Sequence, residues 1–484
     1  MAVSFPSASP VRSSGRPSDD ILRGPIAGAL LRLAGPVVLA NVLQTVYQLT
    51  DTFWVGRIGA TAVAAVSFSF PVLFLFIAVG GGLTIAGTIL VAQAEGRGDG
   101  RQVDYVAGQT YALVTLLSVA LAAAGAALAE PLLRGMGAAP DVLPQATDYL
   151  RLSYIGLPFV FGYFVFQALL RGVGDVKTPL YIVGATVLLN FVLDPLFILG
   201  WGPVPAMGVS GAAAATIGTQ GLAALAGAWL LFSGRRPIHV RWGDLRPDLG
   251  LARRIARLGF PASVDQGMRA LGLTVLVTLV AGFGSEAVAV YGVGTRIFSF
   301  VLIPALGLGI ATSTVVGQNV GANQRLRARR ATAIGTWIAV GTMTAAGALA
   351  FVFARPLVAA FVPGEPVVIE EGARFLRIIA PGWGLIGAQV VIGGGFSGAG
   401  RTYVSMLFSI LSLWVLRFPL AWFLSTRTDL GMEGIWWAFP VSYVGGAALA
   451  VVWFLRILRQ PTGDDDEVEE RAVAESTVGQ PFGR

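Results

Sequence analysis

The sequence predicts an all-α polytopic membrane protein with twelve transmembrane helices, six in each of two similar halves. The first observation is composition: the 484 residues are 55% hydrophobic and 13% charged, whereas soluble proteins carry about 25% charged residues. The second is length, because apolar runs such as 103–129 and 208–232 reach the roughly 20 residues that span a bilayer. The third is an internal repeat, in which the first half of the chain returns in the second.

The repeat preserves chiefly glycine, proline and small residues. The positions that recur without a gap are Leu33, Pro36, Gly59, Ala62, Val63, Ala64, Ile85, Ala86, Gln93 and Gly96, which return as Leu258, Pro261, Gly284, Ala287, Val288, Ala289, Ile310, Ala311, Gln318 and Gly321. A second block, shifted by one further residue, returns Leu150, Arg151, Gly172 and Gly174 as Leu376, Arg377, Gly398 and Gly400. Parallel halves are a common plan of transporters, with the substrate site between them. We interpret the shared residues as the scaffold of each half.

Long apolar windows, separated by glycine, proline and charge clusters, locate the spans. They lie near residues 26–50, 60–92, 103–129, 147–170, 178–199, 208–232, 253–281, 287–316, 330–353, 371–396, 403–424 and 434–457. Arginines gather in the loops that follow the even-numbered spans. The positive-inside rule therefore predicts a multi-pass protein of the plasma (inner) membrane with both termini in the cytoplasm.

The predicted organisation follows from these spans. Residues 1–23 form a disordered cytoplasmic tail, 24–232 the first lobe, 233–252 a cytoplasmic linker, 253–458 the second lobe, and 459–484 a disordered acidic cytoplasmic tail. The linker opens with Arg235-Arg236-Pro237. It is either an amphipathic helix on the membrane surface or a solvated basic connector.

Several classes of function are excluded by residues that the chain lacks. It has no cysteine, so disulfides, thiol catalysis and cysteine-ligated metals are ruled out. The single histidine, His239, lies in the linker, where a solvated role is expected. Lys177 follows Val176 and not the glycine of a P-loop, so no nucleotide-driven pump is encoded. The net charge of +7 reflects the loop arginines and hence topology, not nucleic-acid binding.

These exclusions leave no basis for an enzyme or for a bound cofactor. We expect the partners to be the lipid bilayer and small amphipathic or cationic organic substrates, with no nucleic acid, and we expect a monomer. The energy source is then an ion gradient or the gradient of the substrate itself.

Two acidic residues inside the first half are the candidate coupling site. Asn41, Gln44, Gln48 and Asp51 recur at helical spacing in the first span, beside Tyr47. A polar stripe of this kind does not face lipid. The alternative is that Asp51 is simply solvated at the external end of its span.

In the fifth span, Asn190 and Asp194 share one helix face, and Asp194 precedes Pro195. Two acids with amide and hydroxyl neighbours can form an oxygen cage for Na⁺ or a proton site. Thr216 in the sixth span is a candidate additional oxygen, although a threonine within a helix commonly bonds its own backbone.

The second half lacks these acids. Asp51 falls opposite Leu276, and Asp194 has no acidic counterpart in the eleventh span. Asp265 and Arg269, four residues apart, form either an internal ion pair or a seal at the inner mouth. Arg417 either meets an anionic group or closes a polar network. Only the first half is therefore predicted to sense the ion.

The chain resembles the multidrug and toxic compound extrusion (MATE) family over residues 24–458. The resemblance lies in Leu33-Ala34-Gly35-Pro36, in Asp51-Thr52 with Val55-Gly56-Arg57-Ile58-Gly59, in Arg171-Gly172-Val173-Gly174-Asp175-Val176-Lys177-Thr178-Pro179, and in Asn190-Phe191-Val192-Leu193-Asp194-Pro195. The Arg-Gly-x-Gly-Asp-x-Lys-Thr-Pro stretch is the most specific of these.

This resemblance implies two six-helix lobes in a V, related by a pseudo-twofold axis along the membrane normal. It also implies export of organic cations and other amphipathic compounds, driven by H⁺ or Na⁺ entry. The branch that looks most similar is the prokaryotic DNA-damage-inducible (DinF-like) type, whose cation residues fall on Asp51, Asn190, Asp194 and Thr216. Pro36 matches the proline that in that branch is tied to bending of the first helix. Such bending would make the first helix a gate. The alternative is a static kink that serves packing.

Aromatic, methionine and polar side chains are expected to line the cavity between the lobes. The candidates are Gln44, Tyr47, Gln48, Phe70, Phe166, Met268, Arg269 and Trp383. Packing in a lobe core or against lipid is the alternative for each apolar member. Three other functions are possible: a lipid-linked oligosaccharide flippase, a membrane-embedded transferase and a channel. The flippase would need a cationic cavity, to which Arg269, Arg296 and Arg417 could contribute.

Overall fold

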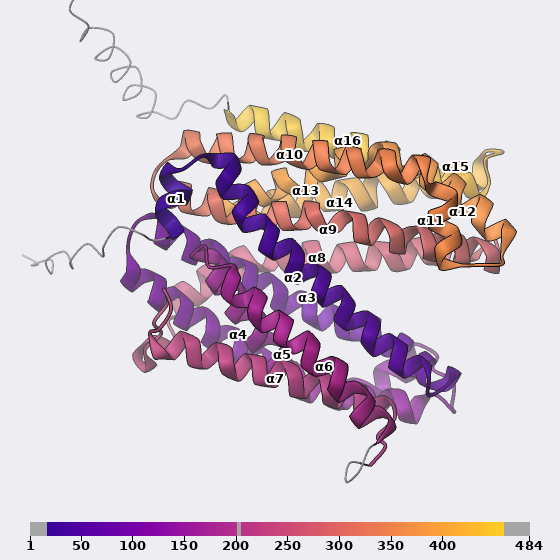
Figure 1. Ribbon diagram of the computed structural model, residues 1–484, viewed down its shortest axis with the longest axis horizontal. Helices are drawn as coiled ribbons and strands as arrows, with labels where there is room; N and C mark the ends of the chain where they lie inside the picture. Colours follow the sequence, from indigo (N-terminus) through magenta and orange to yellow (C-terminus); the bar gives the residue numbers. More distant parts are fainter. Residues whose placement is uncertain (1–16, 201–204, 459–484) are drawn as a thin grey trace, which may run out of the picture.

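The computed structural model describes residues 17–200 and 205–458, and within these ranges the ordered elements are all helical. The helices form two lobes that lie one above the other (Figure 1). Twelve helical segments are long and apolar enough to cross a membrane. The predicted fold class and number of spans are therefore confirmed, and most helices extend a few residues beyond their predicted apolar windows.

The N-lobe comprises six unbroken transmembrane helices. They are α2 (Ile26–Gly56), α3 (Ala60–Gly96), α4 (Gly100–Gly135), α5 (Leu143–Gly172), α6 (Lys177–Leu199) and α7 (Val209–Ser233). Tyr154, Phe161 and Phe166 are fully buried among these helices. The lobe thus has an aromatic core of its own.

The C-lobe has the same order of spans, but two of them are interrupted. Its helices are α8 (Leu249–Ala281), α9 (Ser285–Gly321), α10 (Arg325–Val352), α11 (Ala354–Phe361), α12 (Pro366–Ile379), α13 (Trp383–Gly398), α14 (Thr402–Ile410), α15 (Phe418–Arg427) and α16 (Met432–Leu458). The tenth span breaks at the 3₁₀ turn η2 (Ala380–Gly382), where Pro381 removes a helical hydrogen bond. The eleventh contains the π-helical segment η3 (Leu411–Arg417).

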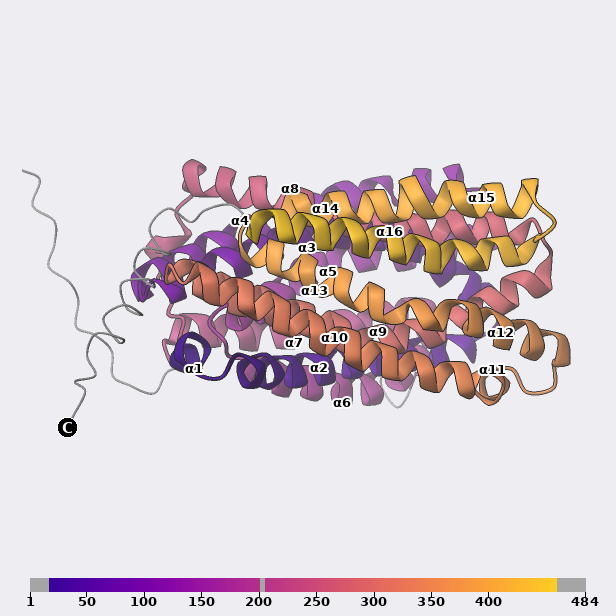
Figure 2. The same cartoon turned by 90° about the horizontal axis from the view of Figure 1, so that it is seen from above.

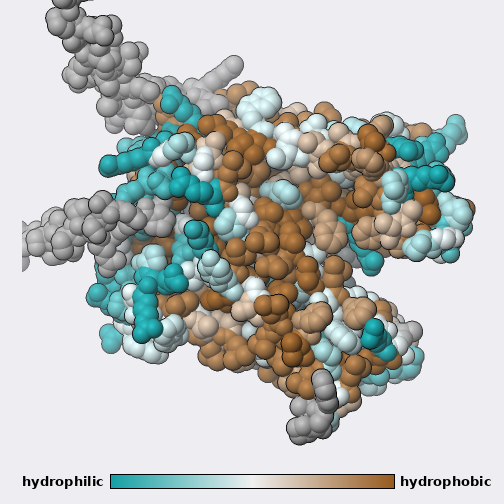
Figure 3. All heavy atoms as spheres, viewed as in Figure 1, coloured by the Kyte–Doolittle hydropathy of each residue, from teal (hydrophilic) through white to brown (hydrophobic). Residues whose placement is uncertain are grey.

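The long axis of the molecule follows the helices. Seen from above, the C-lobe helices run roughly parallel, with α1 near one end and α11 and α12 at the other (Figure 2). An apolar band covers the middle of the molecule, and hydrophilic residues gather toward both ends (Figure 3). This distribution is that of a protein whose middle faces hydrocarbon and whose ends face water.

Two segments depart from the predicted organisation. Residues 17–23, expected as part of a disordered tail, form the helix α1 (Pro17–Arg23), and Arg327 donates hydrogen bonds to the carbonyl oxygens of Ile21 and Gly24. The remaining tail residues, 1–16 and 459–484, lie outside the described part of the chain. The linker is shorter than predicted, because α7 ends at Ser233 and α8 begins at Leu249.

The linker also packs against α4, which contradicts the hypothesis of a solvated basic connector. Its only helical turn is the 3₁₀ segment η1 (Trp242–Leu245), while Ile238 and Val240 have at most 1% of their surface exposed. Gln109 on α4 donates its amide to the carbonyl oxygens of Asp244 and Arg246 at 2.6 and 2.5 Å. The linker is thereby held along α4.

A buried carboxylate is the main charged anchor of the linker. Asp244 is fully buried and accepts a hydrogen bond from Arg101 Nη1 at 2.9 Å. The Arg101 guanidinium lowers the pKa of the Asp244 carboxyl below its usual range. The carboxylate form is therefore stabilised in the folded protein, and this contribution is present above the ordinary aspartate pKa and is lost as the pH falls through the lowered value.

We predict that Asp244→Asn loosens the linker, because the amide retains the shape but not the charge that pairs with Arg101. The variant should be cleaved by trypsin after Arg235 and Arg241 faster than the wild type at neutral pH. The wild type should approach the variant only in strongly acidic solution, below about pH 4, as hydrogen exchange of linker amides would measure. Equal protection of the two proteins at pH 7 would contradict this role.

The lobes meet at the end that carries α1 and diverge toward the other end, where the surface between them is hollowed (Figure 3). At the closed end, two crossed hydrogen bonds join the lobes. Gln93 Nε2 donates to the Gly398 carbonyl oxygen at 3.2 Å, and Gln318 Nε2 donates to the Gly172 carbonyl oxygen at 2.9 Å. These four residues are two pairs of repeat equivalents, so the two bonds obey the pseudo-twofold relation between the halves.

Two further repeat equivalents bring the backbones into contact at this seam. A Cβ atom on Gly96 would lie 1.9 Å from the Gln318 carbonyl oxygen, and one on Gly321 would lie 2.0 Å from the Gln93 carbonyl oxygen. Only glycine allows this approach. The interpretation of Gln93, Gly96 and their equivalents as scaffold within each lobe was therefore wrong: they form the contact between the lobes.

We predict that Gln93→Ala combined with Gln318→Ala destabilises the closed end by about 2 kcal/mol, or roughly thirtyfold in the ratio of closed to separated lobes. Spin labels at Arg97→Cys and Asn323→Cys would report the separation without background, because the chain has no cysteine. In the double variant, electron double resonance should detect an additional population with a longer distance between the two labels.

The matched control is Gln102→Ala, which removes a half-buried amide near the same end. An unchanged distance distribution in the double variant would show that the crossed hydrogen bonds do not hold the lobes together.

Candidate cation site in the N-lobe

Polar side chains from three helices converge inside the N-lobe. Asn190 and Asp194 on α6 have no exposed surface, and the Asn190 amide donates to Asp194 Oδ1 at 2.8 Å. Thr216 on α7 donates to Asp51 Oδ2 on α2 at 3.4 Å. Next to it, the hydroxyl groups of Tyr47 and Thr219 are hydrogen-bonded at 2.9 Å. We call Asp51, Asn190, Asp194 and Thr216 the acidic cluster.

The helical repeat explains why α6 supplies two of these groups. Asn190 and Asp194 are four residues apart and thus lie on one face, which α6 turns toward α2 and α7. Pro195 cannot donate to the carbonyl group one turn earlier, yet α6 continues to Leu199. The proline is accommodated without ending the helix, and it leaves one backbone acceptor unpaired beside the cluster.

The acidic cluster has more acceptors than donors. Asp51 Oδ1, Asn190 Oδ1 and Asp194 Oδ2 are buried, and none has a hydrogen-bond partner in the described part of the chain. The carboxyl groups of Asp51 and Asp194 are close enough to interact electrostatically, although no hydrogen bond joins them. Two negative charges this close in a poorly solvated site repel strongly. A proton or a metal cation between them relieves the repulsion and satisfies the acceptors.

The donor set fits a proton or a hard monovalent cation. Oxygen ligands from carboxylate, amide and hydroxyl groups are those that hard cations prefer. Among the described residues, no group of three or more His, Cys, Asp and Glu side chains is placed to hold a metal. The cluster, with only two acids, therefore lacks the charge of a typical divalent metal site.

The structure adds one residue that was missed in the sequence, because Thr219 bonds Tyr47 beside the acidic cluster. The signal was present, because Thr219 follows Thr216 by three residues and therefore shares its face. Tyr47, expected in the substrate cavity, is 3% exposed and belongs to the surroundings of the acidic cluster.

The helix α2 connects this cluster to the other lobe. It runs unbroken through Pro36, and near that proline it packs closely on α9. A Cβ atom on Gly307 would meet Val38 Cγ2 at 2.4 Å and the Ala34 carbonyl oxygen at 3.4 Å. The helix that carries Asp51 thus also contacts the C-lobe.

The remaining predicted cavity residues do not form one surface. Gln48 is exposed and Gln44 is half-buried on α2. Arg269 on α8 is paired with Asp265 at 3.1 Å and donates to Ser409 at 2.8 Å. The two side chains form an ion pair, as both hypotheses for them require.

Met268 is half-buried on α8. Its carbonyl oxygen accepts a hydrogen bond from the Trp414 indole at 3.2 Å.

Two predicted cavity residues are core residues instead. Phe166 has no exposed surface, and its ring lies where a Cβ atom on Gly227 would be 2.5 Å away. Trp383 also has no exposed surface and packs beside Phe298, with ring centroids 5.8 Å apart. Large rings in closely packed lobes are enclosed by neighbouring helices, so neither side chain can contact a substrate in this conformation.

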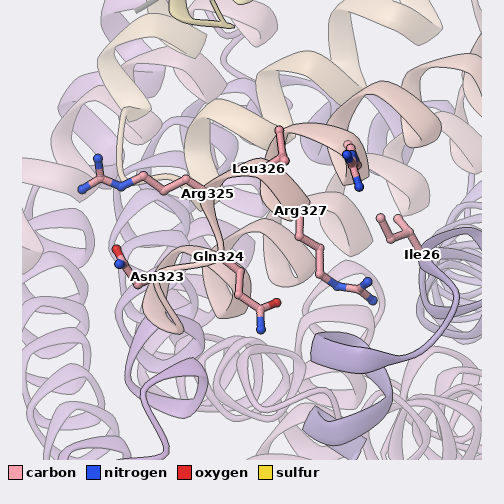
Figure 4. A pocket seen from close by; sticks show the side chains of 7 residues that line it. Ile26, Asn323, Gln324, Arg325, Leu326 and Arg327 are labelled. Atoms are coloured by element: carbon pink, nitrogen blue, oxygen red, sulfur yellow. The ribbon is translucent and has the colours of Figure 1, made fainter. Parts of the chain in front are cut away.

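A separate cavity lies at the closed end, between the start of α2 and the start of α10 (Figure 4). It has a volume of about 310 Å³ and is lined by Ile26, Asn323, Gln324, Arg325, Leu326, Arg327 and Arg330. Ile26 precedes Asp51 by 25 positions on α2, or about 38 Å of helix. This cavity is therefore distinct from the acidic cluster.

The architecture of two six-helix lobes, with polar groups buried in one of them, is that of a membrane transporter. The family model MatE matches residues 36–196 and 261–423. The chain belongs to the MATE family of multidrug transporters, as its sequence motifs indicated.

Relatives in this family are similar over most of their length. The probable multidrug resistance protein YoeA of Bacillus subtilis is 33% identical over 84% of this chain and 89% of its own. The FAD transporter of Shewanella oneidensis is 28% identical over 87% of this chain and 93% of its own.

Solved structures are similar in fold as well. An outward-facing multidrug resistance MATE transporter of the MOP superfamily has a TM-score of 0.86 and 27% identity, with 93% of this chain and all of the other covered. A MOP superfamily transporter from Pyrococcus furiosus has a TM-score of 0.86 and 26% identity, covering 92% of this chain and 98% of the other. The two-lobe arrangement is thus shared with proteins of this family.

We predict that Asp51→Asn removes the response of thermal stability to cations. Binding of an ion to the folded state alone raises the melting temperature as its concentration rises. In detergent, the melting temperature of the wild type should rise with the concentration of one of the two ions, Na⁺ or H⁺. The melting temperature of the variant should not rise with that ion. A variant whose melting temperature still follows the same ion would remove Asp51 from the site.

Proposed function

We propose that the protein is a cation-coupled antiporter that exports organic cations and other amphipathic compounds by alternating access, with H⁺ or Na⁺ as the coupling ion. The observation that carries this proposal is the pair of neighbouring carboxyl groups, Asp51 and Asp194, whose outer oxygens have no partner in the described part of the chain. Membership in a multidrug transporter family supports the substrate class. No catalytic step is required of the chain.

In the proposed mechanism, the cation and the substrate both act on the position of α2. A cation between Asp51 and Asp194 draws α2 toward α6 and α7, because it replaces repulsion by attraction. Pro36 gives α2 a point at which it can bend, close to its contact with Gly307. Movement of α2 therefore alters the contact between the lobes, and the substrate is released when the cation is bound.

The proposed orientation places the closed end in the cytoplasm of a bacterial-type inner membrane. The loops at this end carry Arg97, Arg325 and the arginines of the linker, in agreement with the positive-inside rule. The hollow between the lobes then opens to the outside, and the described conformation is outward-facing. We propose that the protein works as a monomer, since each lobe buries its own core.

The flippase alternative requires several arginines free to hold a pyrophosphate group. Arg269 is paired with Asp265, and Arg417 is 5% exposed. Arg296 on α9 is exposed but lies on a helix that supplies no second arginine in its membrane-spanning middle. This distribution favours the exporter over the flippase.

The test is transport of a fluorescent organic cation by proteoliposomes under separately imposed pH and Na⁺ gradients. The wild type should transport under one of them. Asp51→Asn and Asp194→Asn should each lower the coupled rate by about tenfold or more, as expected when an ion ligand is lost. The matched control is Asp265→Asn, which removes an intramembrane carboxylate outside the cluster and should leave ion coupling intact. Full coupling in the Asp51→Asn and Asp194→Asn double variant would contradict the proposal.

A further inference from the structure

The short helix α1 lies at the closed end of the molecule, where the two lobes meet (Figures 1 and 2). It precedes the N-lobe in the chain and packs against α2 and α3 of that lobe. It also packs against α9 of the C-lobe. An element that contacts both lobes at this end can resist their separation.

One apolar side chain of α1 is enclosed by residues of both lobes. Ile21 is 3% exposed. It belongs to a buried cluster that contains Leu30 of α2 and Ala328 of α10. Burial of an aliphatic side chain is favourable only while the surface that covers it is in place. Separation of α9 and α10 from the N-lobe would therefore return part of the Ile21 side chain to water.

The C-terminal end of α1 is capped by the C-lobe. The last carbonyl groups of a helix have no partner within that helix. Arg327, which lies on α10, donates from Nη2 to the carbonyl oxygen of Ile21 at 3.1 Å and also to that of Gly24. A cation at this end of a helix is favoured by the helix dipole as well. The C-lobe thus supplies the acceptors of α1 with their donor.

The attachment of α1 to the N-lobe does not depend on the closed end. The chain continues directly from α1 into α2. Asp20 also pairs with Arg32 of α2 at 2.6 Å, but both side chains are exposed, and exposed ion pairs add little stability. The contacts that separation of the lobes would break are therefore those of Ile21 and Arg327.

The helix α1 is too short to be stable without these contacts. It has seven residues, whereas isolated helices shorter than about 12 residues are marginal in water. Burial of Ile21 and the bonds from Arg327 therefore stabilise its helical form, and both require the C-lobe to lie against the N-lobe. Such a segment is ordered in one arrangement of the lobes and loses its order in the other.

We propose that α1 is a strap that holds the closed end shut and must detach before this end opens. The contacts of Ile21 and Arg327 exist only in the closed arrangement, so they shift the population of the protein toward it. This inference goes beyond the proposed function, because the strap acts on the lobes whichever ion or compound is transported. Its test therefore needs no ion gradient and no substrate.

The separation of the lobes is measured on the full-length protein with spin labels at Lys177→Cys and Tyr403→Cys. These two exposed residues lie at the closed end, at the starts of α6 and α14, one in each lobe. The natural chain has no cysteine, so each label has a single position. Electron double resonance then gives the fraction of molecules in which the two labels are far apart.

Arg327→Met should raise this long-distance fraction by about tenfold relative to the wild type, because the charged donor to α1 is lost. The side chain keeps a similar length, so its packing is largely retained. The matched control is Arg325→Met, which removes an exposed arginine from the same turn of α10 and should change the fraction by less than about twofold.

Ile21→Ala is a second variant in case Arg327→Met does not fold. It removes most of a buried side chain and should also raise the long-distance fraction by several fold. Detachment of α1 is followed separately by maleimide labelling of Ile21→Cys, whose thiol replaces a buried group. Adding Arg327→Met should speed this labelling by about tenfold.

Two results would overturn the inference. One is an unchanged distance distribution in both Arg327→Met and Ile21→Ala. The other is equal labelling of Ile21→Cys with and without Arg327→Met, since Arg327 would then not hold α1 in place. If both shifts are found but proteoliposomes show no ion-coupled transport, the strap stands and the proposed antiport is refuted instead.

Discussion

The arrangement of the two lobes depends on a backbone contact that only glycine permits. At the closed end, Gly96 and Gly321 bring α3 and α9 so close that a single Cβ atom on either would overlap a carbonyl oxygen. The crossed hydrogen bonds of Gln93 and Gln318 fix the lobes in register there. Because the helices diverge from this contact, the hollow at the other end and the exposure of the helices that face it follow from it.

The acidic cluster is placed so that its charge state can affect this contact. Asp51 lies toward one end of α2, while Ala34 and Val38 of the same helix contact α9 of the other lobe. A helix transmits displacement along its length because its backbone hydrogen bonds resist bending, except where proline removes one. Pro36 lies between these two contacts, so a bend at this proline would change the packing of α2 on α9 directly.

The lobes share a scaffold but differ in polarity. The N-lobe encloses two neighbouring carboxyl groups, whereas the C-lobe encloses Arg417 among aromatic rings. The oxygens of the acidic cluster are incompletely satisfied within the described part of their own lobe, and such groups are tolerated in membrane proteins where they serve ions or substrates. The two lobes thus share a frame but enclose side chains of opposite charge.

The sequence by itself determined the class of fold and the number of spans, and it predicted the polar residues that the structure brings together in the acidic cluster. Apolar windows predict the number of spans because every backbone polar group in lipid must be hydrogen-bonded within its own helix. The spacing of Asn190 and Asp194 predicts a shared face because the period of the α-helix is fixed. The tertiary structure alone decided which side chains share a space. It placed Phe166 and Trp383 in closed cores, bonded Thr219 to Tyr47, and showed that Gln93 and Gly96 face the other lobe, since contacts between distant helices depend on how whole surfaces fit together and not on local pattern.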